Sequence, residues 1–293
     1  MSLNLDNKFV KLSIKKSLRD LPALPGVVSK IIQETNDPNS STQSVERLLS
    51  SDQALASKVL RVVNSAYYGL SGQVTSLSQA TMILGMLQVR NLVLSVSAMS
   101  TIKPKTPRQQ EIFQQFWLHS FGAAAATQII AKEKRMRIND AEGLFLGGLL
   151  HDIGLLFLYS MFAQTYDQVV RYAEEKQIPT VEAEQRLLGL THSEIGATMA
   201  ARWNLPNTLV TLINDHEGPF DEERDPTVYA VHVSDHLTRD LYDPEGRLPK
   251  PPLAERVADW MQFDEEQLNE LKAATDKKIE EAKSLFGVLA SAA

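Results

Sequence analysis

The chain has 293 residues, of which 43% are hydrophobic and 23% charged, and its net charge is -6 at pH 7. This balance is typical of a folded globular protein and excludes wholesale disorder. The acidic charge offers no broad attraction to phosphate backbones, so we expect no nucleic-acid partner. Because the chain has no cysteine, disulfides and thiolate metal sites are excluded, and His, Asp or Glu must hold any metal.

Apolar residues recur at helical spacing through the first hundred residues, and no segment alternates as a half-buried strand does. Pro25 suits the first turn of a helix, which should end at the Asn-Asp-Pro run of residues 36–38. Residues 52–64 carry apolar side chains at helical spacing, and a further helical stretch is expected over 77–99.

The polar run 103–110, which contains two prolines, is the best internal boundary. Beyond it we expect a long helix that carries His119, followed by further helices. Thr191 and Glu194 have the spacing of a capping box, and Asp225 precedes a proline at a first helical position. These signals together predict an all-α fold.

The most apolar segment is GLFLGGLLHDIGLLFLYSMF, residues 143–162, which His151 and Asp152 interrupt. This interruption favours a pair of buried core helices over a membrane span. The N-terminus has no long apolar stretch of the kind found in a signal peptide. We therefore expect a cytoplasmic protein with no membrane partner.

Residues 241–253 are rich in proline and form a second boundary, which an amphipathic stripe follows. One interpretation is a tail helix that packs on its own domain; the other is a helix that forms a homodimer, although the heptads are imperfect. The apolar members of the stripe are Leu268, Leu271, Ile279, Ala282, Phe286 and Leu289.

His151 and Asp152 are the pair whose surroundings most need an explanation. A carboxylate in an apolar segment is costly to bury unless a hydrogen-bond network, a cation or a metal offsets the cost. The nearby Gly147, Gly148 and Gly154 let another helix or a ligand approach the backbone. If the pair lies on one helix, its side chains project about 100° apart and both can reach one metal. Imidazole and carboxylate ligands suit ions such as Fe, Mn and Zn.

Several motifs, in order, resemble the HDOD family of bacterial signalling proteins, which is related to the HD phosphohydrolases. The resemblance implies an all-α, multi-helix HDOD fold with an HD-phosphohydrolase-like helical core over residues 17–240, divided into 17–102 and 111–240. Residues 1–16 and 241–293 are then an N-terminal extension and a C-terminal helical extension. The motifs that carry the resemblance are LPALPGVVSKIIQETNDPNSS, SDQALASKVLRVVNSAYYGL, FWLHSFGAAAA, LGGLLHDIGLLFL and EAEQRLLGLTHSEIGATMAARWNLP.

The resemblance also implies a metal site for one or two divalent ions, Fe, Mn, Zn or Mg. Asp152 is the catalytic candidate and is able to bridge two ions. Asp215 stands where related sequences place the first of two histidines, and it could still ligate through oxygen. The implied ligands are His119, His151, Asp152, His192, Asp215, His216 and Asp235.

Departures from the active relatives lie close to these positions. Leu155 follows the HDIG motif where many active relatives have a lysine that could bind phosphate. The Gly-Tyr-Pro loop of the HD-GYP branch is absent, and after His216 the chain reads EGPFDEERDP. An acidic loop repels a phosphate. These departures favour a site that holds metal over one that turns over substrate.

Three functions are consistent with the sequence. The favoured one is a signal-transduction regulator that works through a signalling protein partner or a nucleotide ligand, because a fold does not establish activity. The second is a metal-dependent phosphohydrolase acting on a nucleotide or cyclic dinucleotide. The third is a structural module in which the polar residues form a buried hydrogen-bond network. A separate local alternative is a metal pair at His232 and His236, four residues apart on one helix face.

Overall fold

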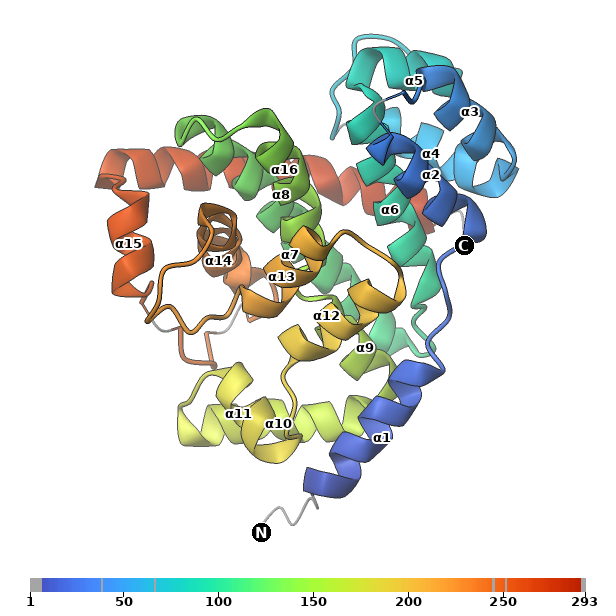
Figure 1. Cartoon of the computed structure of the whole chain (residues 1–293). Helices are drawn as coiled ribbons and strands as arrows, with labels where there is room; N and C mark the ends of the chain where they lie inside the picture. The colour runs from blue at the N-terminus through green and yellow to red at the C-terminus, as the bar shows by residue number, and fades with distance from the viewer. Residues whose placement is uncertain (1–6, 38, 66, 244–245, 251, 291–293) are drawn as a thin grey trace. The chain divides into compact units, whose positions relative to one another are not determined.

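The computed structural model describes residues 7–37, 39–65, 67–243, 246–250 and 252–290. Every regular element within these ranges is a helix, as Figure 1 shows, so the all-α prediction is confirmed. Contacts divide the chain into two compact units. The large unit comprises Met1–Pro22 and Pro104–Lys272, and the small unit comprises Ala23–Lys103 and Ala273–Ala293. Each is described by itself.

The small unit is built on five helices and the end of a sixth. Asp52 caps one of them by accepting a hydrogen bond from the backbone N–H of Leu55, and the apolar face predicted over 52–64 is buried. Its helices are α2 (Gly26–Asn36), α3 (Thr42–Ser50), α4 (Gln53–Val63), α5 (Leu77–Leu84), α6 (Met86–Thr101) and the C-terminal part of α16 (Glu265–Ala290).

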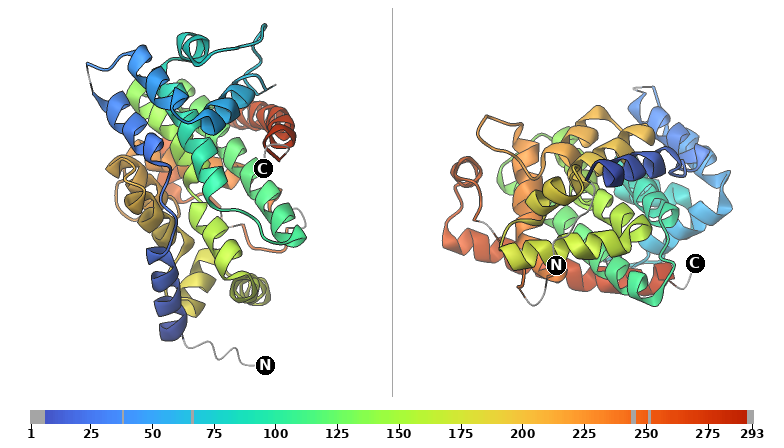
Figure 2. Two further views of the ribbon diagram at one scale, coloured as in Figure 1. Left: turned by 90° about the vertical axis from the view of Figure 1, so that its right-hand side faces the viewer. Right: turned by 90° about the horizontal axis from the view of Figure 1, so that it is seen from below.

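The large unit contains the long helix α7, against which α8 and α14 pack most extensively. Figure 2 shows the helices of the chain from two further sides. Thr106 caps α7, and Pro107 occupies its first turn. The remaining elements are α1 (Asn7–Arg19), α7 (Pro107–Glu133), α8 (Ile138–Leu150), α9 (Ile153–Met161), α10 (Ala163–Lys176), α11 (Thr180–Leu187), α12 (His192–Arg202), α13 (Asn207–Asp215), α14 (Pro226–Thr238), the 3-10 helix η1 (Arg239–Leu241), α15 (Glu255–Met261) and the start of α16.

Two predicted helix starts are confirmed. Thr191 and Glu194 form a reciprocal capping box at the start of α12, with each side chain bonded to the other's backbone N–H. Asp225 accepts a hydrogen bond from the N–H of Thr227 at the start of α14, where Pro226 is the first residue. Both caps satisfy N–H groups that have no partner within the helix.

Close backbone packing brings α8 and α9 against their neighbours. A Cβ atom on Gly148 would lie 2.7 Å from the Cα of Ala124 on α7, and one on Gly154 would lie 2.0 Å from the carbonyl oxygen of His192 on α12. Real side chains do not tolerate such contacts, so these glycines permit the helices to approach. The prediction that the glycines allow a neighbouring helix to come close is confirmed.

By length and composition the stretch Gly143–Met161 could cross a membrane, yet 83% of its apolar window is buried inside the fold. A second candidate, α5 with α6, passes the same test only as one span, and the two helices are bent by 118°. The burial of 143–161 supports the predicted pair of core helices.

The terminal segments are not separate extensions, which differs from the prediction. Residues of α1 bond to the large unit, where Asn7 Nδ2 donates to the carbonyl of Arg186 and Arg202 donates to the carbonyl of Arg19. At the other end, Met261 and Leu271 join the apolar core of the large unit. The predicted boundaries at 16 and 241 therefore miss contacts between residues far apart in sequence.

The amphipathic stripe of the C-terminal helix is largely used within the chain. Leu271, Ile279 and Ala282 are all 5% exposed or less, which supports the interpretation of a tail helix that packs on its own chain. Phe286 and Leu289 lie outside the described side chains. The homodimer stays a prediction.

Candidate metal centre

Six of the seven predicted ligands converge in the large unit. Each of these residues is at most 2% exposed. They come from separate elements, so several helices together form one buried site. The six are His119 on α7, His151 and Asp152 between α8 and α9, His192 at the start of α12, His216 at the end of α13, and Asp235 on α14.

His151 and Asp152 do not lie within one helix, which corrects the expectation from helical spacing. Helix α8 ends at Leu150, and α9 begins at Ile153. Asp152 occupies the N-cap position of α9 with φ -97° and ψ 12°. The two side chains reach the centre because the chain turns between two helices, and not because of the 100° step along one helix.

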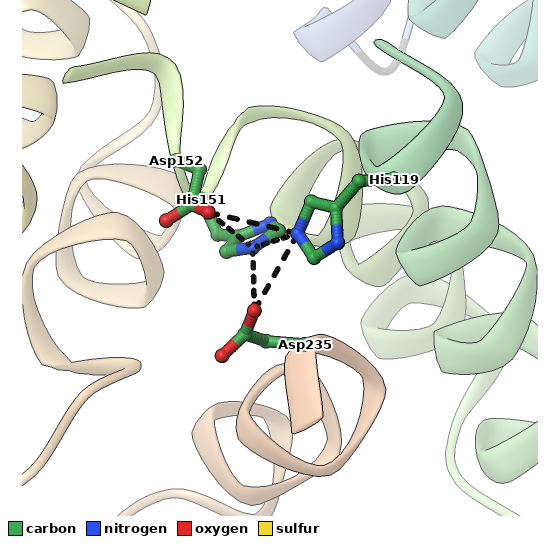
Figure 3. A group of neighbouring side chains, drawn as sticks. All are labelled: His119, His151, Asp152 and Asp235. Carbon is green, nitrogen blue, oxygen red and sulfur yellow. Dashed lines mark hydrogen bonds and ion pairs between the residues drawn. The ribbon is translucent and has the colours of Figure 1, made fainter. Parts of the chain in front are cut away.

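His119, His151, Asp152 and Asp235 form the first group, whose ligand atoms all lie within 4.8 Å of one another. Figure 3 shows the four side chains pointing toward a common point. The Nε2 atoms of His119 and His151 are 3.1 Å apart. Asp152 Oδ2 lies 3.6 Å from the first and 3.4 Å from the second, and Asp235 Oδ1 lies 3.4 Å and 3.6 Å from them.

Asp152, His192 and His216 form the second group. Here the other oxygen of the same carboxylate is used: Asp152 Oδ1 lies 3.2 Å from His192 Nε2 and 3.3 Å from His216 Nε2. Asp152 therefore faces one group with each oxygen. With an ion in each group, this carboxylate would be shared between the two ions.

The hydrogen bonds of the four histidines fix which nitrogen faces the centre. The Nδ1 atoms of His119, His151 and His216 lie 2.8–3.0 Å from backbone carbonyl oxygens of Thr238, Gly148 and Ile213. A carbonyl only accepts, so each Nδ1 carries the hydrogen. His192 Nδ1 lies 2.8 Å from a carboxylate oxygen of Glu184. All four Nε2 atoms are thus directed at the aspartates, which is how metal-binding histidines are oriented.

Glu184 is a buried residue that the sequence interpretation missed. It is 0% exposed, and its carboxylate accepts hydrogen bonds from the hydroxyl of Tyr166 at 2.6 Å and from the backbone N–H of His192 at 2.8 Å, besides the His192 ring. A carboxylate behind a ligating histidine fixes the ring and raises its basicity. Its place eight residues before His192, inside the quoted motif EAEQRLLGLTH, was the available signal.

Burial and charge set the protonation of the centre without a metal. Burial, with repulsion from His151, lowers the pKa of His119 to about 4. Burial also lowers the pKa of His151, but Asp152 and Asp235 outweigh it and raise that pKa to about 10. Burial opposes ionisation of Asp152, yet the surrounding histidines hold its pKa well below the usual range. The centre thus keeps a positive charge beside its carboxylates, which is the requirement a metal ion would meet.

Asp215 does not join either group. Its carboxylate accepts a hydrogen bond from Asn214 and lies 3.5 Å from Arg224 Nη1, and its side chain is 19% exposed. Asp215 is the last residue of α13 and His216 caps it. At this helix end the His216 side chain turns toward Asp152, whereas the Asp215 side chain turns toward Asn214 and Arg224.

The alternative pair of His232 and His236 also stays outside both groups. His232 Nδ1 donates to the carbonyl of His216 at 2.8 Å, and its ring packs on Phe220. His232 thus supports the backbone at a candidate ligand. Nothing among the described residues joins it with His236 around one point.

Three further polar residues, which the sequence interpretation missed, border the centre. Arg239 Nη2 donates to Asp235 Oδ2 at 2.9 Å and to Glu217 Oε1 at 3.0 Å. Glu217 Oε1 lies 3.8 Å from His192 Nε2. Tyr242 donates its hydroxyl to Asp152 Oδ2 at 3.1 Å. Glu217 directly follows His216, whereas the other two lie at the predicted domain boundary near 240 and gave no motif.

A cavity of about 530 Å3 reaches the centre from outside. Leu155, which directly follows the HDIG motif, lines it, as do one candidate ligand, two residues that border the centre and three arginines. These are His192, Glu217 and Tyr242, with Arg108, Arg171 and Arg247. Acidic residues line it as well, and Arg108 is paired with Asp167 at 2.7 Å.

Known proteins resemble this chain over most of its length. A protein of Treponema pallidum (strain Nichols), described as "Uncharacterized protein", is 25% identical over 257 residues, which are 87% of this chain and 48% of that protein. The chain therefore spans about half the length of this curated relative.

Solved structures share the fold. The HDOD domain protein of Geobacter sulfurreducens is 24% identical with a TM-score of 0.66, and the match covers 98% of both chains. The "Putative phosphohydrolase" of Shewanella amazonensis SB2B is 23% identical, with a TM-score of 0.68 and coverage of 95% and 97%. The "Putative signal transduction protein" of Marinobacter aquaeolei VT8 is 21% identical, with a TM-score of 0.75 and coverage of 99% and 68%.

The model of the HDOD domain family matches residues 21–219. That range agrees with the motifs quoted from the sequence, and it includes five of the six buried residues of the centre. The chain belongs to the HDOD family.

Proposed function

We propose that this protein is a cytoplasmic signal-transduction regulator whose buried centre binds one or two divalent metal ions. His119, His151, Asp152 and Asp235 hold the first ion, and Asp152, His192 and His216 hold the second. The protein acts through a signalling protein partner or a nucleotide ligand. Nucleic acid and membrane are not partners.

The observation that carries the metal is the shared orientation of four histidines. Every Nδ1 is engaged with a carbonyl or carboxylate oxygen, and every Nε2 faces Asp152 or Asp235. Without a metal, the protonated His151 ring donates its Nε2–H to the Nε2 atom of the neutral His119 ring, 3.1 Å away. A divalent cation would replace this buried positive charge and would be held by the same side chains. The convergence of four Nε2 atoms and two carboxylates in one buried place therefore supports a metal over a purely structural network.

The donor set restricts the choice of metal. Four imidazoles with two carboxylates suit Fe, Mn or Zn, whereas Mg prefers oxygen ligands and keeps several waters. A bound ion of this kind would lower the pKa of water and polarise a phosphoryl oxygen. We therefore expect Mg to bind weakly at this centre.

Regulation is favoured over turnover by the charges beside the centre. Leu155 supplies no cation where active relatives carry lysine. Arg239 borders the centre, but it is bonded to Asp235 and Glu217. A phosphate beside the ions would therefore lack the cation that usually holds it.

Hydrolysis of a nucleotide or cyclic dinucleotide is the second candidate. The cavity of about 530 Å3 supports it, because it borders His192 and has arginines in its lining. Its size falls within the usual range for small-molecule sites.

Elemental analysis and activity assays on the full chain separate these functions. Purified protein is stripped with a chelator, loaded with Fe, Mn or Zn, and assayed for bound metal and for hydrolysis of phosphodiesters and cyclic dinucleotides. Bound metal without hydrolysis supports the regulator. Hydrolysis that Asp152→Asn abolishes supports the enzyme instead. Wild-type protein that retains no metal refutes the metal centre.

Asp215→Asn is the matched control for Asp152→Asn. Both changes remove one carboxylate charge, but Asp215 lies outside both groups. We expect Asp215→Asn to bind metal as the wild type does and Asp152→Asn to lose at least the second ion.

A further inference from the structure

Tyr242 reaches into the candidate metal centre from the segment that follows η1. Its hydroxyl lies 3.1 Å from Asp152 Oδ2 and 3.4 Å from Asp235 Oδ1. These are the same two oxygens that face His119 and His151 in the first group. The phenol oxygen is therefore an additional donor atom at the edge of that group.

Packing holds the Tyr242 ring in this position. Its centroid lies 4.4 Å from that of the His119 ring. The backbone N–H of Tyr242 donates to the carbonyl of Arg239 at 3.2 Å, and Arg239 itself is bonded to Asp235 and Glu217. The segment is thus attached to the centre by two side chains, that of Arg239 at the start of η1 and that of Tyr242 directly after it.

Described residues that follow Tyr242 are hydrogen-bonded to one another as well. The carboxylate of Asp243 accepts hydrogen bonds from the backbone N–H groups of Arg247 at 3.1 Å and Leu248 at 2.8 Å. Tyr242 also lines the cavity. Its side chain therefore lies between the cavity and the carboxylates of the first group.

We propose that Tyr242 is a metal ligand, whose hydroxyl oxygen is the fifth donor of the first position and closes it to water. This rests on the proposed metal function. Metal sites that serve a structural role are closed by protein ligands, whereas catalytic sites keep an open place for water. Tyrosine oxygen is an established ligand of iron in proteins. A first position without a place for water suits regulation better than hydrolysis. Displacement of residues 239–243 would remove the Tyr242 oxygen and open the position to water.

The test uses the spectroscopic signature of tyrosinate bound to ferric iron, which forms when the Tyr242 hydroxyl releases its proton to solvent on binding the ion. Full-length protein is loaded with ferrous iron without oxygen and then oxidised, and its visible absorption and resonance Raman spectra are recorded. We expect a phenolate-to-iron charge-transfer band in the wild type and its loss in Tyr242→Phe. Tyr159→Phe is the matched control, because Tyr159 lines the same cavity but belongs to neither ligand group. It should keep the band.

Loading with manganese gives a second measurement, the relaxation of solvent water protons. Tyr242→Phe should relax water faster than the wild type, because an opened position admits an exchanging water. Iron-loaded wild type without the band, or a band that survives in Tyr242→Phe, overturns the ligand. If Tyr242→Phe does not fold, the wild-type spectrum still shows whether a tyrosine binds the iron. A band that both Tyr159→Phe and Tyr166→Phe keep then excludes these two tyrosines and supports Tyr242 as the ligand. Protein that binds no metal by elemental analysis refutes the proposed function together with this inference.

Discussion

Replacing Glu184 with glutamine removes the negative charge beside His192 and leaves the size of the side chain almost unchanged. In the native centre the carboxylate accepts hydrogen bonds from the Tyr166 hydroxyl, the His192 backbone and the His192 ring. Glutamine has one oxygen that accepts and one nitrogen that only donates. At least one of the three donors therefore loses its acceptor.

The substitution has two consequences of similar size, one for folding stability and one for metal affinity. Leaving a buried donor without a partner costs about 1–3 kcal/mol of folding stability. Removing the carboxylate behind a ligating histidine typically lowers metal affinity about 10–100-fold, which is ~1.4–2.7 kcal/mol. Because His192 belongs to the second group only, this loss should fall on the second ion.

Equilibrium dialysis against graded concentrations of Mn or Zn, with elemental analysis of the bound metal, measures both positions. We expect Glu184→Gln to lose the second ion at concentrations that saturate the wild type, while the first ion stays bound. Thermal unfolding of the metal-free variant measures the stability term separately.

Glu182→Gln provides the control. Glu182 lies two residues earlier on α11, pairs with Arg186 at the surface, and is 43% exposed. Its replacement should change neither affinity nor unfolding. Equal metal affinity for Glu184→Gln and the wild type would refute the role of Glu184 in orienting His192.

Three further outcomes are expected. Gly154→Ala should lose about 1–3 kcal/mol of stability and weaken the second ion, because its methyl group meets the backbone of His192. In metal-free protein, the raised pKa of His151 stabilises the fold below pH 6.5, and this contribution is lost as the pH rises toward about 10. The lowered pKa of His119 destabilises the fold as the pH falls from 6.5 to about 4, so the unfolding temperature in chelator should peak near pH 6.5. His232→Gln should leave the number of bound metal ions unchanged, as elemental analysis can measure.

Each of these outcomes has a comparison. Gly26→Ala adds the same methyl group where no atom lies within 4 Å, so it should cost far less than Gly154→Ala. His151→Gln should flatten the decline above pH 6.5, and a decline that persists would assign it to other groups. If His232→Gln lost a metal ion, the second group would need another ligand.

The sequence by itself determined the helical fold and most of the candidate ligands. Local chemistry was sufficient for the helix starts: Thr191 with Glu194 and Asp225 before Pro226 cap their helices through neighbours within three residues. The apolar surroundings of His151 and Asp152 required a partner for a buried carboxylate, and the ordered motifs supplied the remaining histidines. These features depend on short spacings, which a sequence displays directly.

Only the tertiary structure decided which side chains face the centre. Asp215 and His216 are adjacent, and the end of α13 turns His216 inward and Asp215 toward Arg224. The sequence also could not show that the two oxygens of Asp152 serve different groups.

Residues that are distant from the ligands in the sequence could not be assigned to the centre from their spacing. Tyr242 lies ninety positions from Asp152 in the sequence, yet bonds to it. Glu184 lies inside a quoted motif, but its contacts with Tyr166 and His192 appear only in the fold. The segment after residue 241 belongs to the large unit for the same reason, since Leu271 packs into an apolar core formed largely by earlier helices of that unit. Such contacts are selected by how helices pack against one another, and that packing is decided by the whole chain.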